Sequence, residues 1–304
     1  MCSSDLFEDA ARDCTTIVRI DPSYKYALGY RNHYRLQCCD WRDLDDERTK
    51  IVAGIRAGTR IIPPFANIAL GTSPEDELAC ARICANDLWP PAEKPLWRGE
   101  VYRHPKIRLA YISGDFRETP VATLMAGIFE RHDKNKFDVT AISLVPGDTS
   151  NMRIRLSRAF DRMTDVHLKS DQEVAELLRR SEIDIAIDLS GYTEPCRPGI
   201  LGFRPAPVQV SYLGYPGTTG LSTIDYIVAD KTVIPENHKP YYSEQVVYLP
   251  GSYLPNDSRR RIAERVPSRS EAGLPENTFV FCSFNASHKF APDMFGVWMR
   301  LLRQ

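Results

Sequence analysis

The residues best suited to chemistry lie in a glycine-rich loop between two apolar runs, at residues 214–220. The loop reads G-Y-P-G-T-T-G, so three of its seven residues are glycines, and a tyrosine and two threonines supply hydroxyl groups. Glycine lets a backbone turn sharply and approach a ligand closely. The composition therefore favours a ligand-binding turn, although an ordinary connector between two strands would have the same composition.

Two carboxyl groups, Asp115 and Glu176, could act as a general base beside such a loop. Asp115 follows the apolar run 107–112, and Glu176 lies on a predicted helix that precedes the apolar run 183–189. A carboxylate serves as a base near neutral pH only where its surroundings raise its pKa. The alternatives are a turn residue at Asp115 and a solvent-facing helix residue at Glu176.

The elements that would position these residues alternate between strand and helix after Lys106. Strands are predicted at 107–112, 137–144, 183–189, 208–213, 224–229 and 245–249, and helices at 119–129, 152–160 and 170–180. This alternation predicts parallel βαβ units in a doubly wound, Rossmann-like α/β sheet. Ligands bind at the carboxyl ends of the strands in such sheets. We therefore expect the loops at 113–116, 190–193 and 214–220, together with Asp230, to face one crevice.

The N-terminal part is predicted to be α-helical. Helices are expected over 5–36, with a break at Asp21-Pro22, and over 41–62, ending at Pro63-Pro64. Another helix is expected from Ser73, a suitable N-cap followed by proline and acids, to about Leu88. Residues 10–24 resemble part of one tetratricopeptide repeat. Because such arrays need about three units, we interpret this segment as the tail of an array.

The C-terminal part is predicted to be a polar linker followed by one strand and one helix. The linker spans 257–277, the strand 278–284 and the helix 292–303. One strand and one helix cannot bury a core, so they are interpreted as the start of a truncated second lobe. The chain is thus divided into 1–104, 105–256, 257–277 and 278–304. Apolar helix residues and free strand edges predict self-association through 278–304, or folding back on the first lobe.

Composition and charge exclude several classes of protein. The chain is 43% hydrophobic and 26% charged, with a formal net charge of -1, so nothing indicates a nucleic-acid or membrane partner. No signal peptide or apolar run of spanning length is present, which predicts a cytoplasmic protein. The eight cysteines lack metal-ligand spacing and are expected to be reduced thiols. No dinucleotide or P-loop motif occurs, so no cofactor and no metal are expected.

Seven segments, in order along the chain, resemble one known family. They are P-L-W-R-G-E-V-Y-R-H, A-Y-I-S-G-D-F, D-L-S-G-Y-T, R-P-A-P-V-Q-V-S-Y-L-G-Y-P-G-T-T-G, D-Y-I-V-A-D, Y-S-E-Q-V-V-Y-L-P and L-P-E-N-T-F-V-F-C-S-F-N-A-S-H-K. The chain resembles the O-GlcNAc transferase/SPINDLY glycosyltransferases, most of all their bacterial tetratricopeptide-bearing members. The resemblance implies two Rossmann-like lobes in the GT-B arrangement, with a nucleotide sugar, commonly UDP-GlcNAc, between them. It also implies inverting transfer, without a required metal, to Ser or Thr of protein acceptors held by upstream repeats.

The resemblance also implies the substrate-binding residues. The sugar pocket would be lined by the loop at 213–218, and the neighbouring strand-end loops would contribute further contacts. Lys289, after the first strand of the second lobe, would contact the donor phosphates, where a fixed ammonium offsets the charge of the leaving group. The substrate-binding set is Tyr192, Thr193, Leu213, Gly214, Tyr215, Pro216, Gly217, Thr218, Asn285 and Lys289.

The sequence departs from the family in its catalytic positions. Thr119 and Thr123 stand where bacterial members usually carry histidines, and threonine cannot act as a base near pH 7. Ala286 replaces a usual polar amide, and most of the second lobe is missing. We therefore expect the 304-residue chain to transfer no sugar detectably. Two alternatives stay open: a non-catalytic protein-binding member, and a SPINDLY-like O-fucosyltransferase that uses GDP-fucose.

Overall fold

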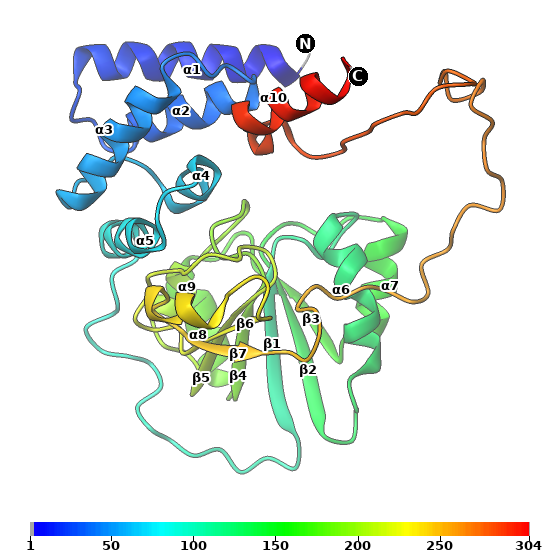
Figure 1. The fold of residues 1–304 in the computed structure, drawn as a ribbon. Coiled ribbons are helices and arrows are strands. Elements are labelled where there is room, and N and C mark those ends of the chain that lie inside the picture. Colours follow the sequence, from blue (N-terminus) through cyan, green and yellow to red (C-terminus); the bar gives the residue numbers. More distant parts are fainter. Residues whose placement is uncertain (1–2, 304) are drawn as a thin grey trace.

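A computed structural model describes residues 3–303, and it consists of a helical segment that adjoins one parallel β-sheet (Figure 1). The helical segment confirms the prediction for the N-terminal part, including the break at Asp21-Pro22. Its helices are α1 (Ser3–Ile20), α2 (Ala27–Gln37), α3 (Leu44–Arg56), α4 (Pro64–Leu70) and α5 (Pro74–Leu88).

Helix α4 was not predicted, because the sequence analysis treated Pro63-Pro64 only as a stop. Pro64 instead occupies the first turn of α4. Proline is favourable there, since its missing N–H would have no partner within the helix. The predicted start of α5 is confirmed, because the Ser73 side chain accepts the Asp76 N–H at 3.2 Å.

The sheet has seven parallel strands in the order β3-β2-β1-β4-β5-β6-β7, as a doubly wound fold requires. The strands are β1 (Ile107–Ser113), β2 (Phe137–Ser143), β3 (Arg162–Asp165), β4 (Ile185–Asp188), β5 (Val208–Tyr212), β6 (Tyr226–Ala229) and β7 (Gln245–Tyr248). A 3₁₀ turn, η1 (Glu236–Tyr241), precedes β7. Six of the strands were predicted. The missed strand, β3, is a short edge strand with the sequence R-M-T-D, which lacks a buried apolar pattern.

Alternate residues of the strands point to opposite faces, and each face is covered by its own helices. Ala110 and Ile112 of β1 pack in one core with α8 (Asp171–Arg180) and α9 (Gly199–Gly202). Leu109 and Tyr111 pack in a second core with α6 (Pro120–Arg131) and α7 (Asn151–Ala159). The two pairs of helices lie on opposite sides of the sheet (Figure 1). The α/β fold class is therefore confirmed.

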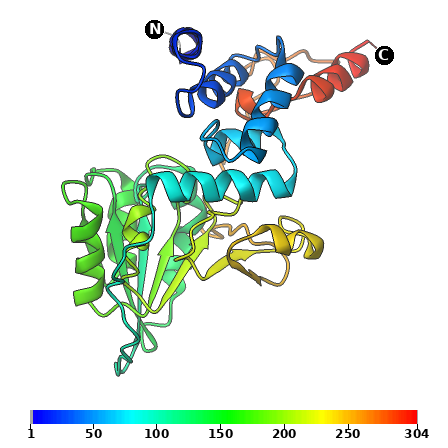
Figure 2. The same ribbon diagram turned by 90° about the vertical axis from the view of Figure 1, so that its left-hand side faces the viewer.

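Helix α5 joins the helical segment to the sheet. It lies across the top of the strands in Figure 2, between the sheet and the remaining helices. Ala85 of α5 belongs to the same core as Ala110. The helices of the N-terminal part are thus anchored on the sheet near its strand ends.

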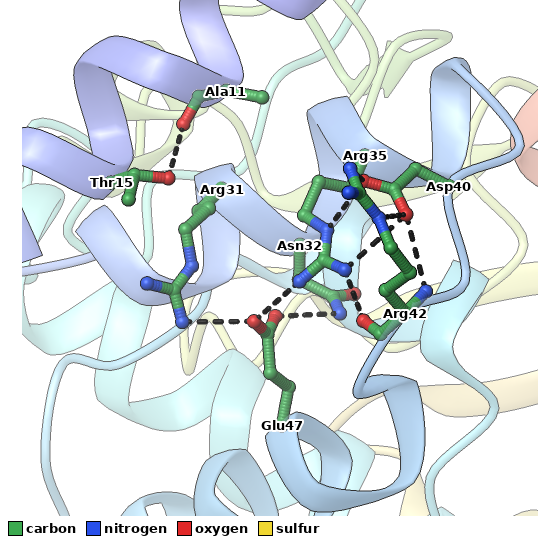
Figure 3. A network of polar contacts seen from close by, with 8 residues as sticks. All are labelled: Ala11, Thr15, Arg31, Asn32, Arg35, Asp40, Arg42 and Glu47. Carbon is green, nitrogen blue, oxygen red and sulfur yellow. Dashed lines mark hydrogen bonds and ion pairs between the residues drawn. The ribbon is translucent and has the colours of Figure 1, made fainter.

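A buried carboxylate holds α2 and α3 together (Figure 3). Glu47 of α3 is only 5% exposed. Its oxygens accept hydrogen bonds from Arg31 at 2.9 Å, Arg35 at 2.8 Å and Asn32 at 3.3 Å, all on α2. A buried charge is tolerated only where it is paired and hydrogen-bonded, as it is here.

The last part of the chain returns to the helical segment. Asp257 is fixed beside α7 by Arg155 at 2.7 Å, and an extended stretch then leads to η2 (Ser287–Lys289) and α10 (Pro292–Leu301). Helix α10 lies beside α2 and α3 in both views (Figures 1 and 2), and the rings of Trp41 and Phe295 are 5.4 Å apart. It does not fold back on the first lobe.

The predicted strand at 278–284 is wrong, because these residues form no strand. No other strand of the described residues pairs with them, and an isolated strand cannot satisfy its main-chain groups. The prediction of a helix at 292–303 is confirmed except at its C-terminal end. Within residues 3–303, no helix combines the length and apolarity that a membrane span needs.

Candidate active site

The loop after β5 packs closely on the end of β4. Leu213 has a φ of 76°, a left-handed conformation that is rare for a residue with a side chain. A Cβ on Gly214 would lie 2.2 Å from the Leu189 carbonyl oxygen. Glycine at 214 is therefore required by the contact between the two loops, and this contact brings the ends of β4 and β5 together.

The two threonines of the loop are bound to a buried glutamate that the sequence analysis did not select. Glu244 is 4% exposed and accepts the Thr218 hydroxyl at 2.8 Å and the Thr219 N–H at 2.7 Å. The Thr219 hydroxyl also donates to Glu244. The Tyr242 hydroxyl donates to the Pro216 carbonyl at 3.0 Å. These bonds hold the loop in one conformation, and the Thr218 hydroxyl is used within the protein.

Two tyrosines connect the loop to the end of β4 and to α5. The Tyr192 hydroxyl donates to the Thr219 carbonyl at 2.5 Å, and the rings of Tyr192 and Tyr215 meet edge to face at 5.3 Å. Both are buried together with Tyr26 and Cys84, and Phe65 of α4 packs against this group, which we call the tyrosine cluster. Burial raises the pKa of both tyrosines well above the usual value, so both stay protonated.

The end of β1 carries Asp115 beside the first turn of α6. A Cβ on Gly114 would lie 2.2 Å from Pro195, so this loop touches the loop after β4. Asp115 is partly buried, and burial raises the pKa of its carboxyl group above the usual value. Asp115 therefore lies where the sequence analysis expected a base, at a strand end that meets the end of β4.

The two threonines at the histidine positions serve the start of α6. The Thr119 hydroxyl donates to the Asp115 carbonyl at 2.9 Å and accepts the Ala122 N–H at 3.3 Å. The Thr123 hydroxyl donates to the Thr119 carbonyl at 2.9 Å. Both hydroxyls thus satisfy main-chain groups, and Thr119 is the N-cap of α6.

Two polar residues at the end of β4, Asp188 and Ser190, were not selected as site residues, although Ser190 belongs to the loop at 190–193 that was expected to face the crevice. Asp188 accepts the N–H groups of Ser190 at 3.0 Å and Gly191 at 2.9 Å, and burial raises its pKa to about 6. The Ser190 hydroxyl is buried without a hydrogen-bond partner in the described part of the chain. Thr193 donates to the Ser190 carbonyl at 2.7 Å. The D-L-S-G-Y-T segment contained this signal, since polar residues directly follow a buried strand.

Comparison with known proteins assigns the chain to a family. The family model of glycosyl transferase family 41 matches residues 97–264, which include the whole sheet and its strand-end loops. The chain belongs to this family.

Relatives of the family 41 chain come from plants, animals and bacteria. It is 32% identical to a probable UDP-N-acetylglucosamine--peptide N-acetylglucosaminyltransferase SEC of Arabidopsis thaliana over 298 residues, which is 89% of this chain and 30% of the relative. It is also 32% identical to a UDP-N-acetylglucosamine--peptide N-acetylglucosaminyltransferase of Caenorhabditis elegans, over 53% of this chain and 14% of that protein. The expected resemblance to O-GlcNAc transferases is thereby confirmed.

A solved structure shares the fold. A mutant O-GlcNAc transferase of Thermobaculum terrenum matches with a TM-score of 0.71 and 25% identity, over 97% of this chain and 56% of that chain. The family 41 chain therefore spans about half of the solved relative, and less than a third of the Arabidopsis protein.

Several predicted site residues of the family 41 chain lie away from the strand-end loops. Glu176 on α8 contacts Arg180 at 3.5 Å and Gln172 at 3.1 Å, both on the same helix. Asp230 does lie at a strand end, directly after β6, but it accepts the N–H groups of Thr232, Val233 and Tyr253 and closes a turn there, and these bonds lower its pKa. Asn285 and Lys289 are exposed in the segment that returns to the helices.

No group of metal ligands is found in residues 3–303: no three histidine, cysteine, aspartate or glutamate side chains are placed to hold an ion. The cysteines of α5 are buried, and burial raises the pKa of Cys84 to about 11, so this thiol stays protonated. Cys2 lies outside the described residues.

Proposed function

We propose that this chain supplies the first catalytic lobe of a protein O-linked sugar transferase. The donor is a nucleotide sugar, UDP-GlcNAc, and the acceptors are Ser or Thr hydroxyls of proteins. The observation that carries the proposal is the rigid loop 213–220, which lies against the end of β4 within the region that the family model matches. The curated relatives are named for transfer of N-acetylglucosamine to peptides, which supports the choice of donor.

The proposed reaction is a displacement at the anomeric carbon of the sugar. The acceptor oxygen forms a bond to this carbon as the bond to the diphosphate breaks, and the hydroxyl proton passes to a base. Asp115 is our candidate for the base, because it lies at the end of β1 and burial raises its pKa above the usual value. Lys289 is our candidate for offsetting the charge of the diphosphate. The proposal uses neither a metal nor a cofactor.

The lobes and partners follow from the same proposal. Residues 105–256 form the first lobe, 257–277 the linker, and 278–304 the beginning of the second lobe. Residues 1–104 continue a tetratricopeptide array that holds protein acceptors, and the protein acts in the cytoplasm.

A second candidate is a non-catalytic protein-binding member of the family. The hydroxyls of Thr119 and Thr123 both bond to main-chain groups, so neither side chain can replace an imidazole base. In that case the helical segment would bind its partners without sugar transfer. GDP-fucose is the alternative donor if transfer does occur.

Transfer of radiolabel to a mixed pool of acceptor proteins tests the proposal. The 304-residue chain is assayed alone and fused to the second lobe of the Thermobaculum relative, with UDP-GlcNAc and GDP-fucose in parallel. We expect label from UDP-GlcNAc with the fusion and none with the chain alone. The boiled fusion and the second lobe alone are the controls. A folded fusion that transfers from neither donor but captures acceptor proteins would favour the second candidate.

A further inference from the structure

The segment that carries Lys289 is docked on the helical segment through one histidine. The His288 ring lies 5.7 Å from the ring of His33 on α2 and 6.0 Å from that of Phe65 on α4. Next to it, the Cys39 sulfur is 4.0 Å from the Ser287 carbonyl oxygen. Contacts from α2, from α4 and from the turn that follows α2 therefore surround a short turn of the chain.

Helix α4 connects this turn to the first lobe. Phe65 contacts His288 and also packs against the tyrosine cluster, which contains Tyr192 and Tyr215 of the strand-end loops. Phe65 thus touches both the segment that carries Lys289 and the strand-end loops of the candidate site. Their relative position is fixed through Phe65.

We propose that His288 is a positioning residue that docks the segment carrying Lys289 onto α2 and α4. The docking itself is independent of catalysis. Its consequence, that Lys289 is placed for the donor phosphates, rests on the proposed function.

Docking requires both imidazoles to be neutral. The Nδ1 atoms of His33 and His288 are buried and have no hydrogen-bond partner within the described residues, so an extra proton would create an unpartnered charge. The Gln37 side-chain nitrogen lies 3.3 Å from His33 Nε2, and it can donate to this atom in the neutral ring when the proton is on Nδ1. Burial and the neighbouring His288 lower the pKa of His33 to about 4, and burial and Lys289 lower that of His288.

The sign of the pH dependence follows from these shifts. An unfolded histidine titrates near ~6.5 and the docked rings titrate lower, so undocking takes up protons. The contact is complete above about pH 6.5 and weakens as the pH falls toward about 4. Charged residues line the adjoining depression with Lys289: Asp43, Asp45, Asp46 and Arg48 of the α3 region and Asp293 of α10. The double variant His33→Phe/His288→Phe separates the contribution of the histidines from that of these charged groups.

Disulfide trapping tests the placement. Ser287→Cys, in a Cys38→Ser/Cys282→Ser background, places a thiol beside Cys39, whereas Ser283→Cys in the same background provides an exposed control in the same segment. We expect rapid cross-linking of Cys39 only in the Ser287→Cys protein. Adding His288→Ala should slow it about tenfold, and His288→Phe should restore it, since an uncharged ring keeps the aromatic contact. Equal cross-linking at both positions, or no effect of His288→Ala, would overturn the proposal.

A pH titration distinguishes docking from a general loss of structure. The NMR signal of the Trp41 indole N–H reports the contact with Phe295 beside the docked turn. Between pH 6.5 and about 4 it should move toward its position in the His288→Ala variant. In the double variant His33→Phe/His288→Phe it should stay constant over this range. A titration that persists in the double variant would refute the role of the histidines. Neither test involves sugar transfer, so failure of the proposed function would leave the docking result intact.

Discussion

At the residue scale, Glu244 decides the conformation of the loop that the resemblance assigns to the sugar. Removing its carboxylate leaves the Thr219 N–H and two threonine hydroxyls without their buried partner. We expect Glu244→Ala to lower the free energy of unfolding by about 2–3 kcal/mol. Glu244→Gln should cost less, because the amide oxygen can still accept one of these bonds. Urea denaturation and hydrogen exchange of residues 214–220 would measure both effects.

The matched control for this prediction is Glu236→Ala. Glu236 precedes the same strand, but its side chain is 56% exposed and pairs only with surface lysines. Exposed ion pairs contribute little to stability. If Glu236→Ala and Glu244→Ala destabilised the protein equally, the buried carboxylate would have no special role in the loop.

A second carboxyl group, Glu77 of α5, predicts a pH-dependent stability. Burial raises the pKa of Glu77 to about 7, whereas an unfolded glutamate titrates near ~4.3. The folded chain binds the extra proton, so stability should fall as the pH rises from about 4.5 to about 7. Glu77→Gln removes this loss. The difference in the free energy of unfolding between this variant and the wild type should therefore be more favourable to the variant at pH 8 than at pH 4.5, by about 1–3 kcal/mol.

Chemical denaturation at pH 4.5, 6 and 8 would test the prediction. Glu75→Gln is the comparison variant, because Glu75 lies on the same turn and hydrogen bonding lowers its pKa. The decline in the free energy of unfolding toward high pH should persist in Glu75→Gln and be smaller in Glu77→Gln. An unchanged decline in Glu77→Gln would assign the effect to other groups.

At the element scale, the sequence predicted elements with strong local signals. Strands β1 and β2 are rich in apolar residues, and α5, α6 and α8 begin at serine or threonine N-caps, so their existence and positions were predictable. Strand β3 was missed because it is short and polar, and α4 because two prolines were interpreted only as a helix stop. The strand at 278–284 was predicted from composition, whereas strand formation depends on a pairing partner.

The candidate site was predictable as a set of strand-end loops but not in its hydrogen bonding. Parallel strands bring their carboxyl ends to one edge, so Asp115, Tyr192 and the loop at 214–220 could be grouped from the sequence. The bond between Thr218 and Glu244 joins residues 26 positions apart in the sequence. No local pattern indicates such a pair. Hydroxyl groups selected as ligand contacts from composition can therefore be occupied within the fold.

The bond network between α2 and α3 gives a prediction for the helical segment. Glu47 is the shared acceptor of Arg31, Arg35 and Asn32 (Figure 3). Glu47→Ala removes the shared carboxylate of two partly buried arginines, of which Arg35 keeps Asp40 at 3.1 Å, and should destabilise the segment by about 3 kcal/mol. Glu47→Gln should lie between this variant and the wild type. Hydrogen exchange of α2 and α3 would locate the effect.

The control for this prediction is Asp46→Ala, one position earlier on the same helix. Exchange in α2 and α3 should change little in that variant. If the strands of the sheet lost protection as much as α2 and α3 did in Glu47→Ala, the helical segment and the sheet would unfold as one unit. That result would contradict a local effect.

At the scale of the whole molecule, the chain buries its apolar residues in the sheet and the helical segment but not between residues 278 and 286. Phe279, Phe281 and Phe284 are 80%, 60% and 96% exposed. The centroids of the Phe279 and Phe281 rings are 4.8 Å apart. Single exposed apolar residues are common, but several aromatic residues close together indicate a surface that binds another protein surface.

We therefore predict that the isolated chain self-associates through this exposed phenylalanine segment. Burying one large apolar side chain contributes roughly 1.5–3 kcal/mol, so pairing two such segments can outweigh the ordering of a flexible stretch. Light scattering of the full chain, of a chain ending at Asn277, and of a Phe279→Ser/Phe281→Ser/Phe284→Ser variant would measure it. The full chain should form larger species as its concentration rises, and the other two should stay monomeric. The triple variant is decisive, because it retains α10 on the helical segment. Association that persists in it would assign the contact to another surface, and three monomers of equal solubility would contradict self-association altogether.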